Sequence, residues 1–371
     1  EGRDPRGDAQ LRAARTFQAT LFDADMAGLT YPEQYGGQGL SKDHERIFRE
    51  VSGNFPVMTP NLGISLCMCL PMLDEYCTYH QRALYERHLI RADEVWCQMF
   101  SEPGAGSDVA ILQTRAVRDG DEWILNGQKV WTTSANFAEK GFIVLRTNPD
   151  VPKHDGISFA LIDMNQPGVE VRPIITLDGE HEVNEVFLTD VRVPVANLVG
   201  EENKGWTYAK YLLTHERTNI AGVGFSNAGL EAVKRIAKAE MSGGKPLIEN
   251  PHFAARIAQV EMELMALSLS NLRIVSKAAK GGAPGLEASM LKVKGSIIRQ
   301  EINDLARRAV GPYALPFASE AVEGANEPPI GPDYAGPVAA QYFNNRKLSI
   351  FGGSNEVQRE IIAKTTLGRM Q

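Results

Sequence analysis

The sequence predicts a mainly helical α+β protein in three parts: an N-terminal helical domain over residues 1–94, a middle antiparallel β-barrel or sandwich domain over 95–204, and a C-terminal four-helix bundle domain over 205–371. Two changes of hydrophobic periodicity predict these boundaries, from helical to strand-like near Val95 and back to helical near Gly205. Because the middle strands follow one another closely with no helix between them, they favour a barrel or sandwich over a Rossmann sheet.

Composition limits the classes of function. The chain has 371 residues, 43% of them hydrophobic and 23% charged, which is ordinary for a globular protein with room for two or three domains. No apolar run approaches the roughly 20 residues that span a bilayer. The net charge of −7 argues against nucleic-acid binding, which normally needs a basic surface.

All four cysteines, Cys67, Cys69, Cys77 and Cys97, fall in the first hundred residues. Their C-x-C spacing has no matching Cys or His pair further on, and the residues around them are apolar. We therefore expect buried reduced thiols rather than a metal site or a disulfide framework. The first residues lack the hydrophobic core of a signal peptide, so the expected location is reducing and cytoplasmic.

Turn signals punctuate the middle segment. Asp119-Gly120 and Asn126-Gly127 each lie between β-prone runs, and each predicts a hairpin turn. Four later runs predict further strands, and these are GFIVLRT, GISFALIDM, VEVRPI and NEVFLTDVRV.

Apolar residues return to helical spacing in the last segment, and this spacing predicts long bundle helices. They are Ile257, Val260, Leu264, Leu267, Ile274, Leu291, Ile298, Ile302 and Leu305. Residues 311–338 are rich in Gly, Pro, Ala and Glu, which indicates an excursion between two bundle helices.

The string MFSEPGAGSD, from Met99 to Asp108, is the most informative in the chain. Gly104 and Gly106 allow the backbone to approach a ligand closely, while Ser101 and Ser107 offer hydroxyl groups. The string matches neither the Rossmann fingerprint nor a phosphate-binding loop. On spacing alone, a plain β-turn is the better interpretation.

A second string, VWTT at Val130–Thr133, ends a predicted strand. An indole beside a hydroxyl can pack on a planar heteroaromatic ring and hydrogen-bond its edge. Taken alone, the pattern is more typical of a core tryptophan followed by a threonine on the sheet surface.

Together the motifs SEPGAGSD, NGQKVWTT, HER and FGGSNEVQR, in this order, resemble the acyl-CoA dehydrogenase family. PEQYGGQGLS and NEVFLTDVRVP fit the same series, and the resemblance extends from about Leu11 to Gly368. It implies FAD bound non-covalently between the β domain and the bundle. It also implies α,β-dehydrogenation of an acyl-CoA thioester in fatty acid β-oxidation or related lipid degradation, with electron-transfer flavoprotein as the electron acceptor.

The resemblance also assigns site residues. The implied cofactor contacts are Gln98, Met99, Phe100, Ser101, Gly106, Ser107, Trp131, Thr132, Thr133, Ser354 and Glu356. Within this set, Trp131 and Thr133 match the positions beside the flavin ring and at its N5 edge. The implied substrate contacts are Ser107, Arg217, Gly352 and Gly353. In the family, a flavin ribityl hydroxyl and a backbone N–H near the C-terminal loop stabilise the charge on the thioester carbonyl.

The catalytic base departs from the best-known pattern. Many members carry a glutamate where this chain has Gly352, and glycine supplies no carboxylate. A second class places its glutamate on a bundle helix in an L-x-x-E-R context, which Leu213, Glu216 and Arg217 reproduce. We therefore expect Glu216 to be the base, against the alternative that it only pairs with Arg217. His215 faces about 100° away on a helix and is expected to be structural.

Two further segments depart from the family. Glu240–Pro246 has glutamate where relatives carry the arginine that clamps the FAD pyrophosphate of a neighbouring subunit. Arg307–Tyr313 replaces a Gln-x-x-Gly-Gly segment, and Arg307 or Arg308 is a candidate to restore the lost charge. These changes suit an atypical bacterial subset that acts on bulky or dicarboxylic CoA esters, and steroid-type or branched acyl groups fit it.

Three other interpretations stay open at this point. The chain as an FAD-binding, non-dehydrogenating subunit that needs a partner chain is the main alternative. A DNA-associated relative is disfavoured by the net charge, and an acyl-CoA oxidase normally has extra C-terminal length. The expected assembly is a homo-oligomer, dimer or tetramer, or a subunit of a heterotetramer, with no metal.

Overall fold

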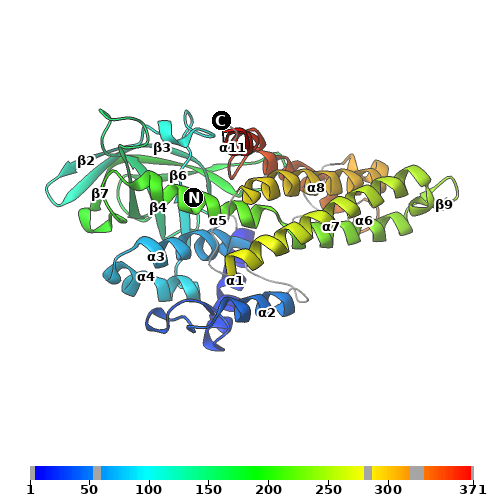
Figure 1. Ribbon diagram of the computed structural model, residues 1–371, viewed down its shortest axis with the longest axis horizontal. Helices are drawn as coiled ribbons and strands as arrows, with labels where there is room; N and C mark the ends of the chain where they lie inside the picture. Colours follow the sequence, from blue (N-terminus) through cyan, green and yellow to red (C-terminus); the bar gives the residue numbers. More distant parts are fainter. Residues whose placement is uncertain (1–4, 53–59, 280–285, 317–329, 369–371) are drawn as a thin grey trace. The chain divides into compact units, whose positions relative to one another are not determined.

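The computed structural model (Figure 1) describes residues 5–52, 60–279, 286–316 and 330–368. The side chains at 5–6, 49–50, 60, 214–220, 275 and 278–279 lie outside this description. The chain divides into two compact units. The first comprises Glu1–Ile174 and His181–His215, and the second comprises Ile175–Glu180 and Glu216–Gln371.

Helices open the first unit, as the helical periodicity predicts. They are α1 (Pro5–Asp23), α2 (Lys42–Ser52), α3 (Leu70–Tyr76), α4 (Tyr79–Arg91) and, after the sheet, the start of α5 (Gly205–Ile220). Helix α4 begins with a capping box, in which the Thr78 side chain accepts the Gln81 N–H and the Gln81 side chain accepts the Thr78 N–H. The helices and the sheet share one unit, so the domain boundary at residue 94 stays a prediction.

A seven-stranded sheet fills the rest of this unit. Its strands are β1 (Trp96–Met99), β2 (Arg115–Asp119), β3 (Glu122–Thr133), β4 (Lys140–Arg146), β5 (Ile157–Asp163), β6 (Val169–Ile174) and β7 (Val183–Pro194). The order is β1-β4-β2-β3-β7-β6, with β5 paired to β4. Successive residues of β4 point into two different hydrophobic cores. Phe142 belongs to the core that contains residues of the helices, and Ile143 belongs to the core formed mainly by strand residues. All four runs predicted as strands are confirmed.

The expectation of a purely antiparallel sheet is wrong. Strand β1 pairs with β4 in parallel, from Trp96 opposite Lys140 to Met99 opposite Ile143, and β2 touches β4 in parallel at Arg115. A parallel pair needs a long crossover, and here the β2–β3 hairpin lies between the two strands in the chain. Because β1 enters the sheet directly from the helical segment, no hairpin turn in the sequence reports its direction.

One of the two predicted hairpin turns is confirmed. Asp119 pairs with Glu122 across a tight turn in which Gly120 has φ +62°. Asn126-Gly127, by contrast, lies inside β3, where the register with β7 shifts between Leu125 and Gly127. The Asn126 side chain exchanges two hydrogen bonds of 3.0 Å with Asp190, so it replaces backbone pairing at this β-bulge.

Glycine is required at the bulge by a close approach. A Cβ on Gly127 would lie 2.6 Å from Thr114 Oγ1 and 2.7 Å from its Cα. The turn-like sequence Asn126-Gly127 therefore forms a β-bulge inside strand β3, and the chain does not reverse there.

The cysteines follow the prediction only in part. Cys69 and Cys97 are buried reduced thiols, Cys77 is half-buried, and Cys67 is exposed. Burial raises the pKa of Cys97 to about 12, so this thiol stays protonated and unreactive near neutral pH. Cys67 departs from the expectation because it lies on the outward side of the π-helical turn Ser65–Cys69.

The second unit is helical. Its helices are α6 (Val223–Ala239), α7 (Pro251–Ala279), α8 (Glu287–Val310), α10 (Gly336–Asn344) and α11 (Asn355–Leu367), with a small hairpin of β8 (Met241–Ser242) and β9 (Lys245–Pro246). Helices α6, α7 and α8 lie side by side around one core (Figure 1), and every apolar residue predicted at helical spacing is buried there. None of the described helices is long and apolar enough to cross a membrane.

A short piece of the middle segment belongs to this helical unit. Ile175–Glu180 follows β6, and the carboxylate of Asp178 is 5% exposed. That carboxylate accepts hydrogen bonds from Thr176 and from Asn344 at the end of α10. The predicted excursion at 311–338 is only partly visible, because residues 317–329 lie outside the described chain.

A buried ion pair holds the turn after β1. Lys129 Nζ lies 2.8 Å from Glu102 Oε1, and the two side chains are 0% and 6% exposed. Glu102 also accepts the backbone N–H groups of Gln113 and Thr114, at 2.5 and 2.9 Å. Burial raises the pKa of Glu102, but Lys129 and these hydrogen bonds outweigh burial and bring it below its ordinary value. Burial lowers the pKa of Lys129 to about 8, against the Glu102 charge that raises it.

Replacing Lys129 by methionine leaves the Glu102 carboxylate buried without its cation. We expect Lys129→Met to lower the free energy of unfolding by about 3–5 kcal/mol, measured by urea denaturation. Lys140→Met is the matched control, because Lys140 pairs at 2.6 Å with Asp163 in the same sheet but near its surface. The control loses less than about 1 kcal/mol. Equal losses in both variants would contradict the structural role of the buried pair.

Glu102 also makes the free energy of unfolding depend on pH. Its pKa is lower in the folded chain than the ordinary 4.5, so its contribution is complete above pH 4.5 and disappears as pH falls through the folded value. We expect the free energy of unfolding to fall more steeply below pH 4.5 in the wild type than in Glu102→Gln. Parallel curves of stability against pH for the two proteins would exclude this contribution.

Candidate functional site

The end of β3 holds a strained tryptophan. Trp131 has φ +61°, a left-handed conformation that is uncommon for a residue other than glycine. The register with β7 shifts between Lys129 and Thr132, so Trp131 sits in a second β-bulge of the same strand. Its side chain is 60% exposed. A bulge that turns a large aromatic side chain outward at an energetic cost is typical of a functional site.

The threonines beside it face different ways. Thr132 is 1% exposed, its carbonyl accepts the Asn184 side-chain amide at 3.0 Å, and its Oγ1 has no hydrogen-bond partner among the described residues. Thr133 is half-buried and ends the strand. Of the predicted trio, Trp131 and Thr133 therefore offer side chains near the surface, whereas the hydroxyl of Thr132 lies inside.

The motif from Gln98 to Ser107 leaves β1 and turns. Met99 and Phe100 are buried in the cores on the two faces of the sheet, so these residues contribute backbone rather than side chain to any ligand. Glu102 and Ala105 exchange two backbone hydrogen bonds of 3.0 Å. The plain β-turn expected from the spacing is therefore confirmed at 102–105.

Hydrogen bonds bring the two motifs together. The Val130 N–H donates to the Ser101 carbonyl at 2.9 Å, and Lys129 Nζ donates to the Phe100 carbonyl at 3.2 Å. The exposed Trp131 thus follows directly on residues that clamp the turn. Sequence analysis missed Lys129 as a supporting residue, because lysine is a residue type that is rarely buried.

The outer part of the turn is open. Gly106 and Ser107 are exposed, and a Cβ built on Gly104 or Gly106 would meet no protein atom within 4 Å. The described protein around these glycines therefore gives no steric reason for the missing side chains. Gln98 Oε1, at the base of the motif, is buried and has no described hydrogen-bond partner.

The remaining predicted residues with described side chains belong to the second unit. Gly352 and Gly353 form a left-handed turn with φ +64° and +80°. Ser354 caps α11 by accepting the Val357 N–H at 3.3 Å. The Glu356 side chain is 77% exposed and lies 3.5 Å from Arg359. The glycine turn thus leads directly into a capped helix, and its backbone N–H groups lie at the positive end of the helix dipole.

Glu216 and Arg217 fall on α5, and their side chains lie outside the described residues. Their predicted roles as base and substrate contact therefore stay predictions. His215 also falls in this part of α5.

The segments that depart from the family have partners of their own. The Glu240 carboxylate accepts the Tyr334 hydroxyl at 2.7 Å, and this bond raises the pKa of Tyr334 to about 12. Arg307 and Arg308 both donate to Asp304, at 2.9 and 2.5 Å. The two arginines that were candidates to replace a phosphate clamp therefore share one carboxylate, which offsets only one of their two charges.

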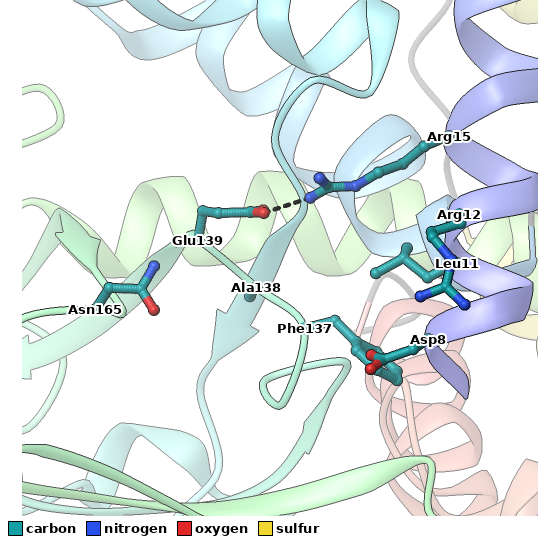
Figure 2. Close-up of a pocket in the computed structure, with 8 residues that line it drawn as sticks. All are labelled: Asp8, Leu11, Arg12, Arg15, Phe137, Ala138, Glu139 and Asn165. Carbon is teal, nitrogen blue, oxygen red and sulfur yellow. Dashed lines mark hydrogen bonds and ion pairs between the residues drawn. The ribbon is translucent and has the colours of Figure 1, made fainter. Parts of the chain in front are cut away.

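A pocket of about 250 Å³ lies elsewhere on the first unit (Figure 2), between α1 and the turn at residues 134–139. Arg15 extends from α1 to pair with Glu139, while Arg12 projects from the same helix (Figure 2). Glu139 also accepts the Val95 N–H at 2.7 Å, so it ties α1 to the start of the sheet. No predicted site residue lines this pocket.

Family models match most of the chain. The model of the acyl-CoA dehydrogenase middle domain matches residues 97–191, and that of the C-terminal domain matches residues 203–367. These ranges contain both site motifs of the sheet, helix α5 and the turn before α11.

Two curated relatives come from Mycobacterium tuberculosis. Acyl-CoA dehydrogenase FadE34 is 32% identical over 95% of the chain, and acyl-CoA dehydrogenase IpdE1 is 31% identical over 95% of the chain. The chain spans 46% of the length of FadE34 and 87% of the length of IpdE1.

Solved structures agree with this assignment. The Tcur3481-Tcur3483 steroid ACAD is 29% identical with a TM-score of 0.82, covering 96% of this chain and 88% of that one. The ChsE4-ChsE5 complex from Mycobacterium tuberculosis is 29% identical with a TM-score of 0.78, covering 99% and 98%. The chain belongs to the acyl-CoA dehydrogenase family, whose members are FAD-dependent oxidoreductases that act on acyl-CoA.

Proposed function

We propose that this chain catalyses α,β-dehydrogenation of an acyl-CoA thioester to the trans-2-enoyl-CoA, with Glu216 as the base. The observation that carries the proposal is the pairing of an outward-turned Trp131 with the open turn at Gly104 and Gly106. Family membership gives the general reaction, and this pairing supplies a place for the cofactor in the first unit.

The residues present fit FAD. An exposed indole at the bulge offers a flat apolar surface for the flavin ring, and Thr133 beside it offers a hydroxyl. The glycine turn exposes backbone that can approach a diphosphate closely, with the Ser107 hydroxyl next to it. Ser354 and Glu356 are proposed as further contacts from the second unit. When bound, FAD accepts the hydride that leaves the substrate β-carbon.

The protein's own task is to take the α-proton. An α-C–H next to a thioester is too weakly acidic for a carboxylate unless the charge that develops on the carbonyl oxygen is stabilised. We assign this stabilisation to the backbone N–H groups of the Gly352-Gly353 turn, where the helix dipole of α11 adds to the effect. Glu216 takes the α-proton as the C–H bond electrons form the double bond and the β-hydrogen leaves as hydride. Arg217 and Ser107 are proposed substrate contacts.

The substrate is proposed to be a bulky acyl-CoA, of steroid or branched type. Gly352 carries no side chain where many relatives carry the base, so more space is available beside the α-carbon. The similarity to a steroid acyl-CoA dehydrogenase supports the same class.

The proposed partners are an electron acceptor and other protein chains. Electron-transfer flavoprotein is the proposed electron acceptor. A homo-oligomer or a heteromeric assembly is proposed, and similarity to the ChsE4-ChsE5 complex supports the heteromeric form. The replacement of an expected arginine by Glu240, which is already bonded to Tyr334, also favours a partner chain that completes one cofactor site.

Anaerobic mixing with acyl-CoA tests the base. In a panel of thioesters that runs from short linear to polycyclic, we expect the bulky members to bleach the oxidised flavin absorbance of the FAD-loaded wild type. Glu216→Gln is expected to slow bleaching by at least about 10³-fold, because the amide cannot accept the proton. Glu231→Gln is the control, since Glu231 is an exposed helix carboxylate paired with Lys234 at 2.9 Å.

Equal bleaching in the wild type and Glu216→Gln would remove Glu216 as the base. If the chain binds FAD but no thioester bleaches it, the proposal fails in favour of the subunit that needs a partner.

FAD affinity tests the tryptophan. We expect Trp131→Ala to raise the FAD dissociation constant by about tenfold, because it removes the apolar surface for the ring. The free energy of unfolding should change by less than about 0.5 kcal/mol, since the side chain is exposed. Val117→Ala, at an exposed position of the same sheet, should leave both quantities unchanged. An unaltered FAD titration for Trp131→Ala would exclude this residue from the cofactor site.

A further inference from the structure

A buried polar cluster lies where α11 begins, against α8. Lys292 and Ser296 stand one turn apart on α8, and Asn355 and Gln358 stand one turn apart at the start of α11. Lys292, Ser296 and Gln358 are 0% exposed and Asn355 is 5% exposed. The two buried residues of α11 are both polar, and polar side chains are costly to bury, so the cluster indicates a role beyond packing.

Asn355 is the centre of the cluster. Its Oδ1 lies 3.0 Å from Lys292 Nζ and 3.1 Å from Ser296 Oγ. Both donors come from one face of α8, so they fix the first residue of α11 to that helix. The residue just before it, Ser354, caps the helix, and the two preceding residues are Gly352 and Gly353.

Gln358 reaches back to the glycine turn. A Cβ built on Gly353 would lie 2.4 Å from Gln358 Nε2, so the side-chain amide lies against the Gly353 backbone. Neither Gln358 Oε1 nor Nε2 has a hydrogen-bond partner among the described residues. A buried amide without partners is rare and calls for an explanation.

We propose that Gln358 and Lys292 are positioning residues that hold the Gly352-Gly353 backbone in place for the thioester carbonyl. This inference rests on the proposed function, in which that turn donates its N–H groups to the developing negative charge. Two adjacent glycines are the most mobile backbone a chain can have. Stabilising the charge requires donors fixed before the reaction. The cluster restrains the turn, because it fixes Asn355 after the turn and packs Gln358 against Gly353.

The contacts that hold the turn are made through the residues that follow it, at the start of α11. Lys292 holds Asn355 at the first position of α11, and Gln358 packs on Gly353 from the next turn of the same helix. Gly353 must be glycine for this contact, since any side chain there would overlap the amide and would also be strained at φ +80°.

The test measures how strongly the site stabilises the deprotonated α-carbon. A 3-thiaacyl-CoA, which loses its α-proton on binding but is not oxidised, gives a long-wavelength absorption with the FAD-loaded protein. The pH midpoint of this absorption reports the acidity of the bound α-C–H. We expect Gln358→Met and Lys292→Met to raise this midpoint by about one unit, a tenfold loss of stabilisation. Ser296→Ala, a milder change, should raise it less.

Lys364→Met is the matched control, because Lys364 lies on the same helix α11 but is 76% exposed and pairs with Glu360. It should leave the midpoint at the wild-type value. Hydrogen exchange at residues 350–358 supplies a readout without ligand or FAD. We expect faster exchange there in Gln358→Met and Lys292→Met and unchanged exchange in Lys364→Met.

The outcomes separate the two proposals. If the wild type forms the absorption but the variants keep its midpoint, the positioning role is wrong and the proposed function stands. A loss of thermal stability with an unshifted midpoint also overturns it, because the cluster would then be only structural. Should the methionine variants fail to fold, Ser296→Ala decides through its midpoint. A wild type that neither binds the analogue nor is bleached by acyl-CoA contradicts the proposed function itself.

Discussion

The two motifs of the proposed cofactor site depend on the ion pair of Glu102 and Lys129. One carboxylate ties together the turn after β1, the start of β2 through the Gln113 and Thr114 N–H groups, and the end of β3. Because both side chains are buried, breaking the ion pair would leave an uncompensated charge in the core. The bulge at Trp131 is two residues further along, so its unusual backbone is supported from a rigid point.

The fold was predictable where local patterns decide it. Helical spacing in the second unit corresponds to a buried face, and the β-prone runs of the middle segment correspond to strands β4 to β7. The direction of β1 and the pairing of the strands were harder to predict from the sequence. The parallel contact of β1 with β4, and the use of Asn126-Gly127 as a bulge, depend on strands distant in the chain. No turn signal carries that information.

The site was predictable only as motifs. Trp131 looked like a core residue from its neighbours, and its exposure follows from a register shift that composition does not encode. The groups that support the motifs were missed for a common reason. Lys129, Lys292 and Gln358 look like surface residues by type, and only packing reveals that each is fully buried. Residue type indicates the average environment of a side chain, whereas the roles proposed for these three residues depend on their being exceptions to that average.

The sequence order of the second unit has a consequence for synthesis. Asp178 is made 166 residues before Asn344, the side chain that it binds at the end of α10. During translation the peptide Ile175–Glu180 therefore emerges long before its binding site exists. This contact can form only after Asn344 has left the ribosome, and the entropic cost of closing the loop between the two residues grows slowly with its length. An isolated fragment that starts at Glu216 would lack Ile175–Glu180, which belongs to the same unit.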